Sequence, residues 1–221
     1  MRAISRTYGV LAVAGLLSAA GCLRKDATHT IYVSPSGVTW SAIERDVRSD
    51  EAEPDRRVAE EQEYLLSALA GRHGVAKALG LLGGTRIQTT ILRREHPFTV
   101  MTEGQFASLP DLAVAMMSAA RVRGDSSIER NGCERTLRVW FDEAGETGES
   151  SNAFAELLVE ATAYRIVLTD GRFVRADGFT IDEDGTIATP GTAPIEDGIV
   201  RASLTWTDGA CQPPAGGPVS R

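Results

Sequence analysis

The sequence predicts an α+β domain with a largely antiparallel β-sheet and several helices packed on one face. Short segments in which apolar and polar residues alternate recur along the chain, and residues 200–206 are the clearest example. Turn dipeptides such as Asn131-Gly132 join neighbouring segments in the manner of β-hairpins. Helical segments separate groups of strands rather than single strands, which is typical of α+β proteins.

The boundaries of the elements follow from turn and capping residues. Pro54 suits the first turn of a helix, and glycines such as Gly71 end one. Ser108 and Asp111 resemble a capping box, with Asp in place of the preferred Glu. The elements expected in chain order are strands at 29–33 and 38–43, helices ending near 71 and spanning 75–82, strands at 86–94 and 98–106, a helix through 112–120, strands at 127–130 and 135–141, a helix at 154–161, and strands within 164–206.

Residues 1–22 have the pattern of an export signal. Arg2 and Arg6 precede an uncharged apolar stretch of about 13 residues, which is too short to cross a bilayer that takes about 20 helical residues. Small residues then precede Cys22. This segment resembles the bacterial lipoprotein signal, with Ala19 where that signal usually has Leu.

The resemblance implies cleavage before Cys22 and attachment of acyl groups such as palmitate to that cysteine, because two or three chains anchor a protein firmly. The expected organisation is a signal peptide at 1–21, a lipidated tether at 22–28, a single domain at 29–211 and a flexible tail at 212–221. We expect the domain in the cell envelope, in the periplasm or at the cell surface. Leu23 favours the outer over the inner membrane. The alternative is an ordinary signal peptide cut after Ala20 or Gly21.

A second resemblance covers residues 164–206. The turn segments at 168–171 and 176–178 and the strand containing Trp206 are similar to the C-terminal part of mycobacterial LppM-like lipoproteins. In that family, strands and glycine turns at these places complete a cupped sheet. The Pro usual in the first turn and the Asn usual in the second are absent here.

The candidate chemical groups point to ordinary structural roles. His29, His73 and His96 lie far apart and lack metal-ligand spacing, so we expect solvated or hydrogen-bonded histidines, no metal site and no cofactor. Residues 182–185 favour a hairpin turn over a calcium loop. Glu60, Glu61 and Glu63 are expected on a solvated helix face. Core packing is the expected role of the three strand tryptophans, Trp40, Trp140 and Trp206.

Two cysteines remain beside the lipidated one. Cys133 and Cys211 each follow a turn-like, glycine-containing segment near the end of a strand. In an oxidising compartment such a pair usually forms a disulfide, which we expect here. Two free buried thiols are the alternative.

These observations favour a non-enzymatic lipoprotein that binds a lipid-like ligand or an envelope protein, with no catalytic residue identified. The net charge of −7 argues against a nucleic-acid partner. A hydrolase with scattered site residues and a structural or assembly lipoprotein are the alternatives. An apolar pocket above about 300 Å³ would favour a ligand, whereas a cleft with converging carboxylates or histidines would favour an enzyme.

Overall fold

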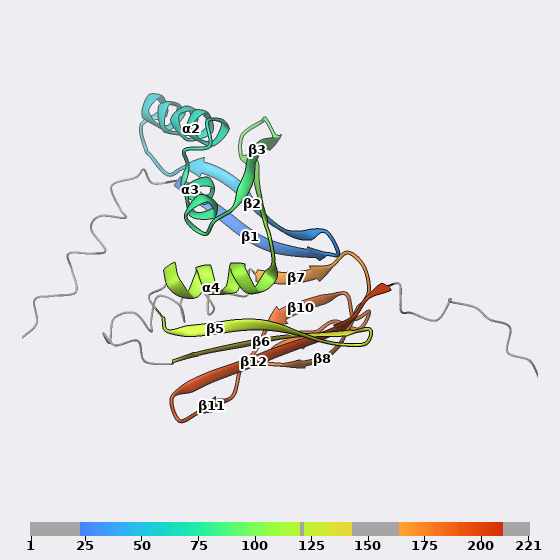
Figure 1. Cartoon of the computed structure of the whole chain (residues 1–221). Helices are drawn as coiled ribbons and strands as arrows, with labels where there is room; N and C mark the ends of the chain where they lie inside the picture. The colour runs from blue at the N-terminus through green and yellow to red at the C-terminus, as the bar shows by residue number, and fades with distance from the viewer. Residues whose placement is uncertain (1–22, 120–121, 143–163, 210–221) are drawn as a thin grey trace, which may run out of the picture.

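The structure is a computed structural model that describes residues 23–119, 122–142 and 164–209, and these residues form two β-sheets and three helices (Figure 1). Sheet A has seven strands in the order β3-β4-β2-β1-β7-β10-β9. Sheet B has five, in the order β11-β12-β6-β5 with β8 also paired to β12. Helices α2 and α3 contact sheet A, and α4 contacts β5 and β6 of sheet B as well as β4.

Sheet A is built around a long hairpin and one parallel pair. β1 (Leu23–Ser34) pairs antiparallel with β2 (Gly37–Ser49) and parallel with β7 (Tyr164–Leu168). A parallel pair needs a crossover connection, and here strands of both sheets lie between β1 and β7 in the sequence. The remaining strands of sheet A are β3 (Thr85–Arg93), β4 (Phe98–Phe106), β9 (Phe179–Ile181) and β10 (Ile187–Pro190).

Sheet B is centred on two paired strands. β6 (Glu134–Asp142) and β12 (Ile199–Thr207) pair antiparallel along their whole length. The other strands of sheet B are β5 (Gly124–Asn131), β8 (Arg172–Asp177) and β11 (Ile195–Glu196).

The three described helices begin where the sequence predicts. They are α2 (Pro54–Leu69), α3 (Gly74–Leu81) and α4 (Leu109–Ala119). At the start of α4, the backbone N–H of Asp111 donates to Ser108 Oγ at 3.2 Å, and Ser108 Oγ donates to the Asp111 carboxylate at 2.6 Å. This reciprocal cap satisfies a backbone donor that the helix leaves free.

One apolar core joins both sheets to α3 and α4. Trp40 of β2 and Trp206 of β12 are each only 4% exposed and belong to this core, as the sequence predicts. Trp140 is half-buried and stays outside it. Leu79 of α3 and Leu112 of α4 are almost fully buried and connect the helices to the same core.

The structure confirms largely antiparallel sheets with helices packed against them, but strands dominate the described residues and further expectations are corrected. The described strands form two sheets rather than one, and the described helices contact different sheets, because each sheet has an apolar face that must be covered. β1 begins at Leu23, so residues 23–28, expected as a tether, belong to the strand. The expected helix at 154–161 lies outside the described residues.

Helix α2 has its buried face where acidic residues were expected to be solvated. Glu61 is 6% exposed, whereas Leu66 and Leu69 are more than half exposed. The Glu61 carboxylate accepts the backbone N–H of Ser49 at 2.9 Å and lies 3.2 Å from Nδ1 of His96. These two partners allow the carboxylate to be buried, because a buried charge that is hydrogen-bonded and paired keeps much of the stabilisation it loses with water.

Candidate functional site

The candidate site is an apolar pocket of about 580 Å³ between the two sheets, next to α4. Residues from β1 and β7 of sheet A, from β6 and β12 of sheet B and from α4 line it, together with residues 178–179, 189–191 and 193. Ligand pockets usually have volumes of about 300–1,000 Å³ and mostly apolar walls. Representative lining residues are Ile31, Leu112, Met116, Val139, Ile166 and Val200.

Small residues line part of the pocket wall, where neighbouring segments of the chain approach closely. Gly178 adopts φ +75°, and a Cβ built on it would lie 2.9 Å from the Cβ of Ala193 and 3.0 Å from the Cβ of Ala202. All three residues line the pocket. A larger side chain at Ala202 would therefore either enter the pocket or displace the neighbouring backbone.

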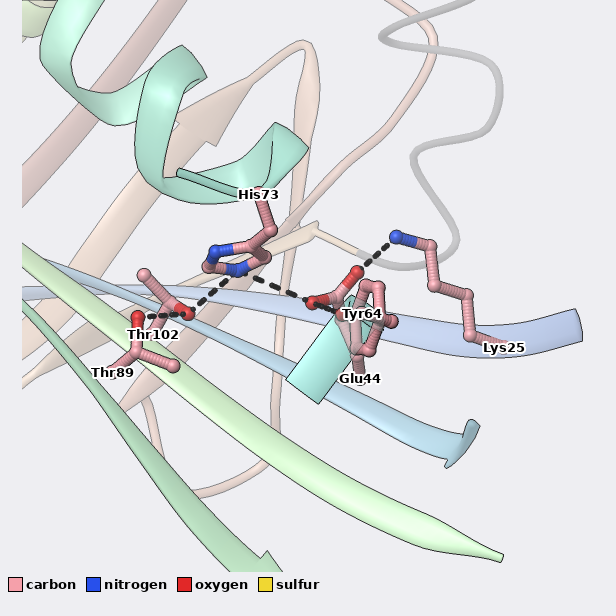
Figure 2. Close-up of polar contacts among 6 residues, drawn as sticks. All are labelled: Lys25, Glu44, Tyr64, His73, Thr89 and Thr102. Carbon is pink, nitrogen blue, oxygen red and sulfur yellow. Dashed lines mark hydrogen bonds and ion pairs between the residues drawn. The ribbon is translucent and has the colours of Figure 1, made fainter. Parts of the chain in front are cut away.

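A second feature is a buried polar cluster around Glu44 of β2 (Figure 2). Glu44 is 1% exposed, and its carboxylate forms an ion pair with Lys25 of β1. Tyr64 OH of α2 donates to the other carboxylate oxygen at 2.5 Å. Nε2 of His73, at the start of α3, lies 3.6 Å from that same oxygen and 3.1 Å from Oγ1 of Thr102.

Burial shifts the titration of this cluster. Burial raises the pKa of Tyr64 above its usual value, and its hydrogen bond to Glu44 and the charge of Glu44 add to the shift. Burial lowers the pKa of His73, partly opposed by the negative charge of Glu44. This shift favours the neutral imidazole, and its Nδ1 atom has no hydrogen-bond partner within the described residues.

The cluster connects elements and does not form an open reaction site. The side chains of His73 and Glu44 are 2% and 1% exposed, so a substrate in solution cannot reach them. Thr89 Oγ1 lies 3.1 Å from Thr102 Oγ1 and continues the polar contacts to β3 (Figure 2). The cluster thus joins β1, β2, β3 and β4 to both α2 and α3.

Each of the three histidines has a hydrogen-bond or ion-pair partner, as the sequence predicts. His29 accepts a hydrogen bond from Trp40 Nε1 at its Nδ1 atom, at 3.1 Å, and stacks on Tyr164 with ring centres 4.5 Å apart. Burial lowers the pKa of His29. His96 lies at the surface beside Glu61. Among the residues that the structure describes, no group of three or more potential metal ligands occurs.

Residues 182–185 belong to a turn between β9 and β10. The Asp182 carboxylate accepts the backbone N–H groups of Thr186 and Ile187 at 2.8 and 2.9 Å. These hydrogen bonds lower the pKa of Asp182. Its carboxylate therefore stabilises the turn, as the hairpin interpretation requires.

The cysteines are only partly within the described chain. Cys133 is exposed, in the two-residue turn between β5 and β6 that Gly132 begins with φ +59°. The backbone N–H of Asp208 donates to the Cys133 carbonyl at 3.2 Å. Cys22 and Cys211 lie outside the described residues.

Comparison with known proteins adds little to this geometry. No protein-family model matches the chain, and no curated protein matches it significantly. Among solved structures, the chain is similar to the folded domain of the LppM protein of Mycobacterium tuberculosis, determined by NMR, with a TM-score of 0.33 and 13% identity. The match covers 85% of this chain and 91% of that chain. A likeness at this level carries no argument about fold or function.

The helices give no sign of a membrane span. In the part of the chain that the structure describes, none of them is both long and apolar enough to cross a bilayer.

Replacing Glu44 by Gln should lower the free energy of unfolding by about 3 kcal/mol, because removing one partner of a buried ion pair leaves the other without its counter-charge. Lys25 is 35% exposed, which places the loss at the low end of the usual range. The matched control is Glu129→Gln, which removes an exposed ion pair to Arg138 and should cost less than about 1 kcal/mol. Urea denaturation at pH 7 measures both, and equal losses would contradict a central role for Glu44.

The domain should also lose stability as the pH falls below about 6.5, the ordinary pKa of histidine. Burial lowers the folded-state pKa of His73, so between the two pKa values the unfolded chain binds more protons than the folded one. The free energy of unfolding is highest above pH 6.5. It falls as the pH drops from 6.5, and the loss is complete once the pH has passed below the folded-state pKa of His73. Urea denaturation between pH 8 and pH 5 measures the slope of the free energy of unfolding against pH.

Variants of the histidines show which residue causes the pH dependence of the free energy of unfolding. His73→Gln and His29→Gln should each make it shallower, because burial lowers the pKa of both residues. Val174→Ala, an exposed position without a titratable group, is the control and should leave it unchanged. An unaltered slope in His73→Gln would rule out its buried imidazole as a source of the pH dependence.

Proposed function

We propose that this protein is an exported bacterial lipoprotein, anchored by acyl groups on Cys22, whose domain binds a lipid-like ligand without enzymatic turnover. The observation that carries the ligand assignment is the apolar pocket of about 580 Å³ between the sheets. Its volume exceeds the value of about 300 Å³ that separates ligand pockets from packing gaps. Its apolar lining suits the hydrocarbon part of a lipid, because burying apolar surface is the main favourable term in such binding.

The start of β1 supports a position close to the membrane. The strand begins at Leu23, the residue directly after the proposed acylation site, and its first residue is already paired with Ser49 of β2. An acyl anchor on Cys22 would therefore hold the domain, and with it the pocket, beside the lipid surface. Leu23 at this position favours the outer membrane.

The buried polar cluster supports binding rather than hydrolysis. Glu44 and His73 lie 3.6 Å apart, and both side chains are out of reach of solvent. General acid–base catalysis requires such groups within hydrogen-bond reach of a substrate. Their burial argues against a catalytic role for this pair. Glu61 and His96, 3.2 Å apart with His96 half exposed, are the accessible carboxylate–histidine pair among the described residues on which the hydrolase alternative would depend.

The disulfide between Cys133 and Cys211 remains part of the proposal. Its support is the hydrogen bond from the Asp208 backbone to Cys133, which brings the chain beside Cys133 three residues before Cys211. A bridge there would close a loop of roughly 80 residues and stabilise the fold by about 4 kcal/mol in the chain-entropy model. It would fix the end of β12 to the β5–β6 turn.

Ligand binding is tested by native mass spectrometry of the full chain purified from its own host. The expected result is an added mass in the lipid range, absent from Ala202→Phe because the new ring occupies pocket volume. Val174→Phe is the matched control, since it adds the same kind of bulk at a position of β8 that is 50% exposed and outside the pocket. Ligand retained by Ala202→Phe, with circular dichroism showing both variants folded, would contradict binding in this pocket.

The anchor is tested by metabolic labelling with a fatty-acid probe. Cys22→Ser should abolish the label and move the protein from the membrane fraction to the soluble fraction, because the thiol that accepts the lipid is gone. Cys133→Ser is the control and should remain labelled and membrane-bound. Undiminished labelling of Cys22→Ser would overturn the proposed address.

Thiol counting tests the disulfide. The mature protein, unfolded without reductant, should show no free thiol at Cys133 or Cys211, because the two are joined in the oxidising envelope. Reduction should then expose both. Two free thiols before reduction would refute the bridge.

A further inference from the structure

The pocket strands share one sequence pattern, an arginine between two pocket-lining residues. Side chains on a β-strand point alternately to opposite faces, so the flanking residues face the pocket and the arginine faces away from it. The pattern occurs on strands of both sheets. Its three examples are Leu137-Arg138-Val139 on β6, Tyr164-Arg165-Ile166 on β7 and Val200-Arg201-Ala202 on β12.

Two of these arginines have partners on the opposite faces of their sheets. Arg138 forms an ion pair with Glu129 at 3.0 Å. Arg165 Nε donates to Oγ1 of Thr30 at 2.9 Å. Arg201 is exposed, on the side of β12 opposite to Val200 and Ala202. The positive charges closest in sequence to the pocket are therefore directed away from a ligand inside it.

The few polar groups in the pocket wall are neutral. No Asp, Glu, Lys, Arg or His occurs among the described residues that line it. Thr189 contributes a hydroxyl that lies 3.5 Å from the carbonyl of Thr180, its acceptor within the sheet. The Tyr164 ring stacks on His29. A charged headgroup inside this pocket would lose its hydration and gain no counter-charge from the described wall, which is strongly unfavourable.

We infer that the pocket selects its ligand by the length of a hydrocarbon chain and not by the charge of the headgroup, which stays in solvent at the pocket entrance. This inference rests on the proposed lipid-binding function and specifies the class of ligand. Each buried methylene contributes a constant increment, equivalent to about a fourfold change in Kd. An unpaired headgroup in water contributes little to the difference between ligands.

The experiment measures displacement of a fluorescent fatty acid from the delipidated full-chain protein. The competitors are a carboxylate, an alcohol and a primary amine, each with 12 and with 14 carbons. Shortening the chain by two methylenes should raise Kd by about fifteenfold in every series. At equal length, the three headgroups should differ by less than about threefold, with the same Kd in 20 and in 500 mM NaCl because no charged pair is there to be screened.

Variants and the alternative results separate this inference from the function on which it rests. Ala202→Phe should weaken all three headgroup series equally, and Val174→Phe should weaken none. If one headgroup binds more than about tenfold tighter and loses that advantage in high salt, the pocket recognises charge. Lipid binding would then stand and the inference would be wrong. If neither the competitors nor the fluorescent probe binds, the proposed lipid-binding function and the inference about chain length are both overturned.

Discussion

The burial of the Glu44 carboxylate constrains how α2 and α3 are placed on sheet A. A charge in a protein interior persists only when it is paired and hydrogen-bonded, and Glu44 obtains its partners from three other elements. Lys25 comes from β1, Tyr64 from α2 and His73 from the start of α3 (Figure 2). The placement of both helices on sheet A is therefore coupled to one side chain of β2. Apolar contacts such as those of Leu79 then complete the packing.

A chain of ring contacts leads from this sheet to the pocket. Trp40 lies on the same face of β2 as Glu44, four residues earlier, and donates to His29. His29 in turn stacks on Tyr164, whose side chain lines the pocket. Burial lowers the pKa of His29, which favours the neutral ring behind an apolar wall. No charged side chain occurs in the described pocket wall.

Local patterns in the sequence predict the elements well, but not their partners. Ser108 and Asp111 mark the start of α4, and the alternation ending at Trp206 marks β12, because capping and strand periodicity are local properties. The division into two sheets depends on pairings between distant strands, which local patterns do not encode. Glu44 did carry a signal. It continues the buried positions Val38, Trp40 and Ala42, so a charged residue at the next inward position indicates a buried ion pair. The pocket gave no comparable signal, since its walls come from α4 and both sheets.

The small residues in the pocket wall determine how a bound ligand would affect stability. Protein interiors are close-packed, and an unfilled apolar volume forgoes contacts that larger side chains would make. The described pocket wall combines large apolar residues such as Leu112 and Met116 with the small residues Gly178, Ala193 and Ala202. A side chain at Gly178 would meet the Cβ atoms of Ala193 and Ala202, so this position cannot fill the volume without a backbone shift. With a hydrocarbon chain in the pocket, the same small residues complete a close-packed core, so under the proposed function the ligand acts as a removable part of that core. Stability gained on binding would then scale with the apolar surface that the ligand buries.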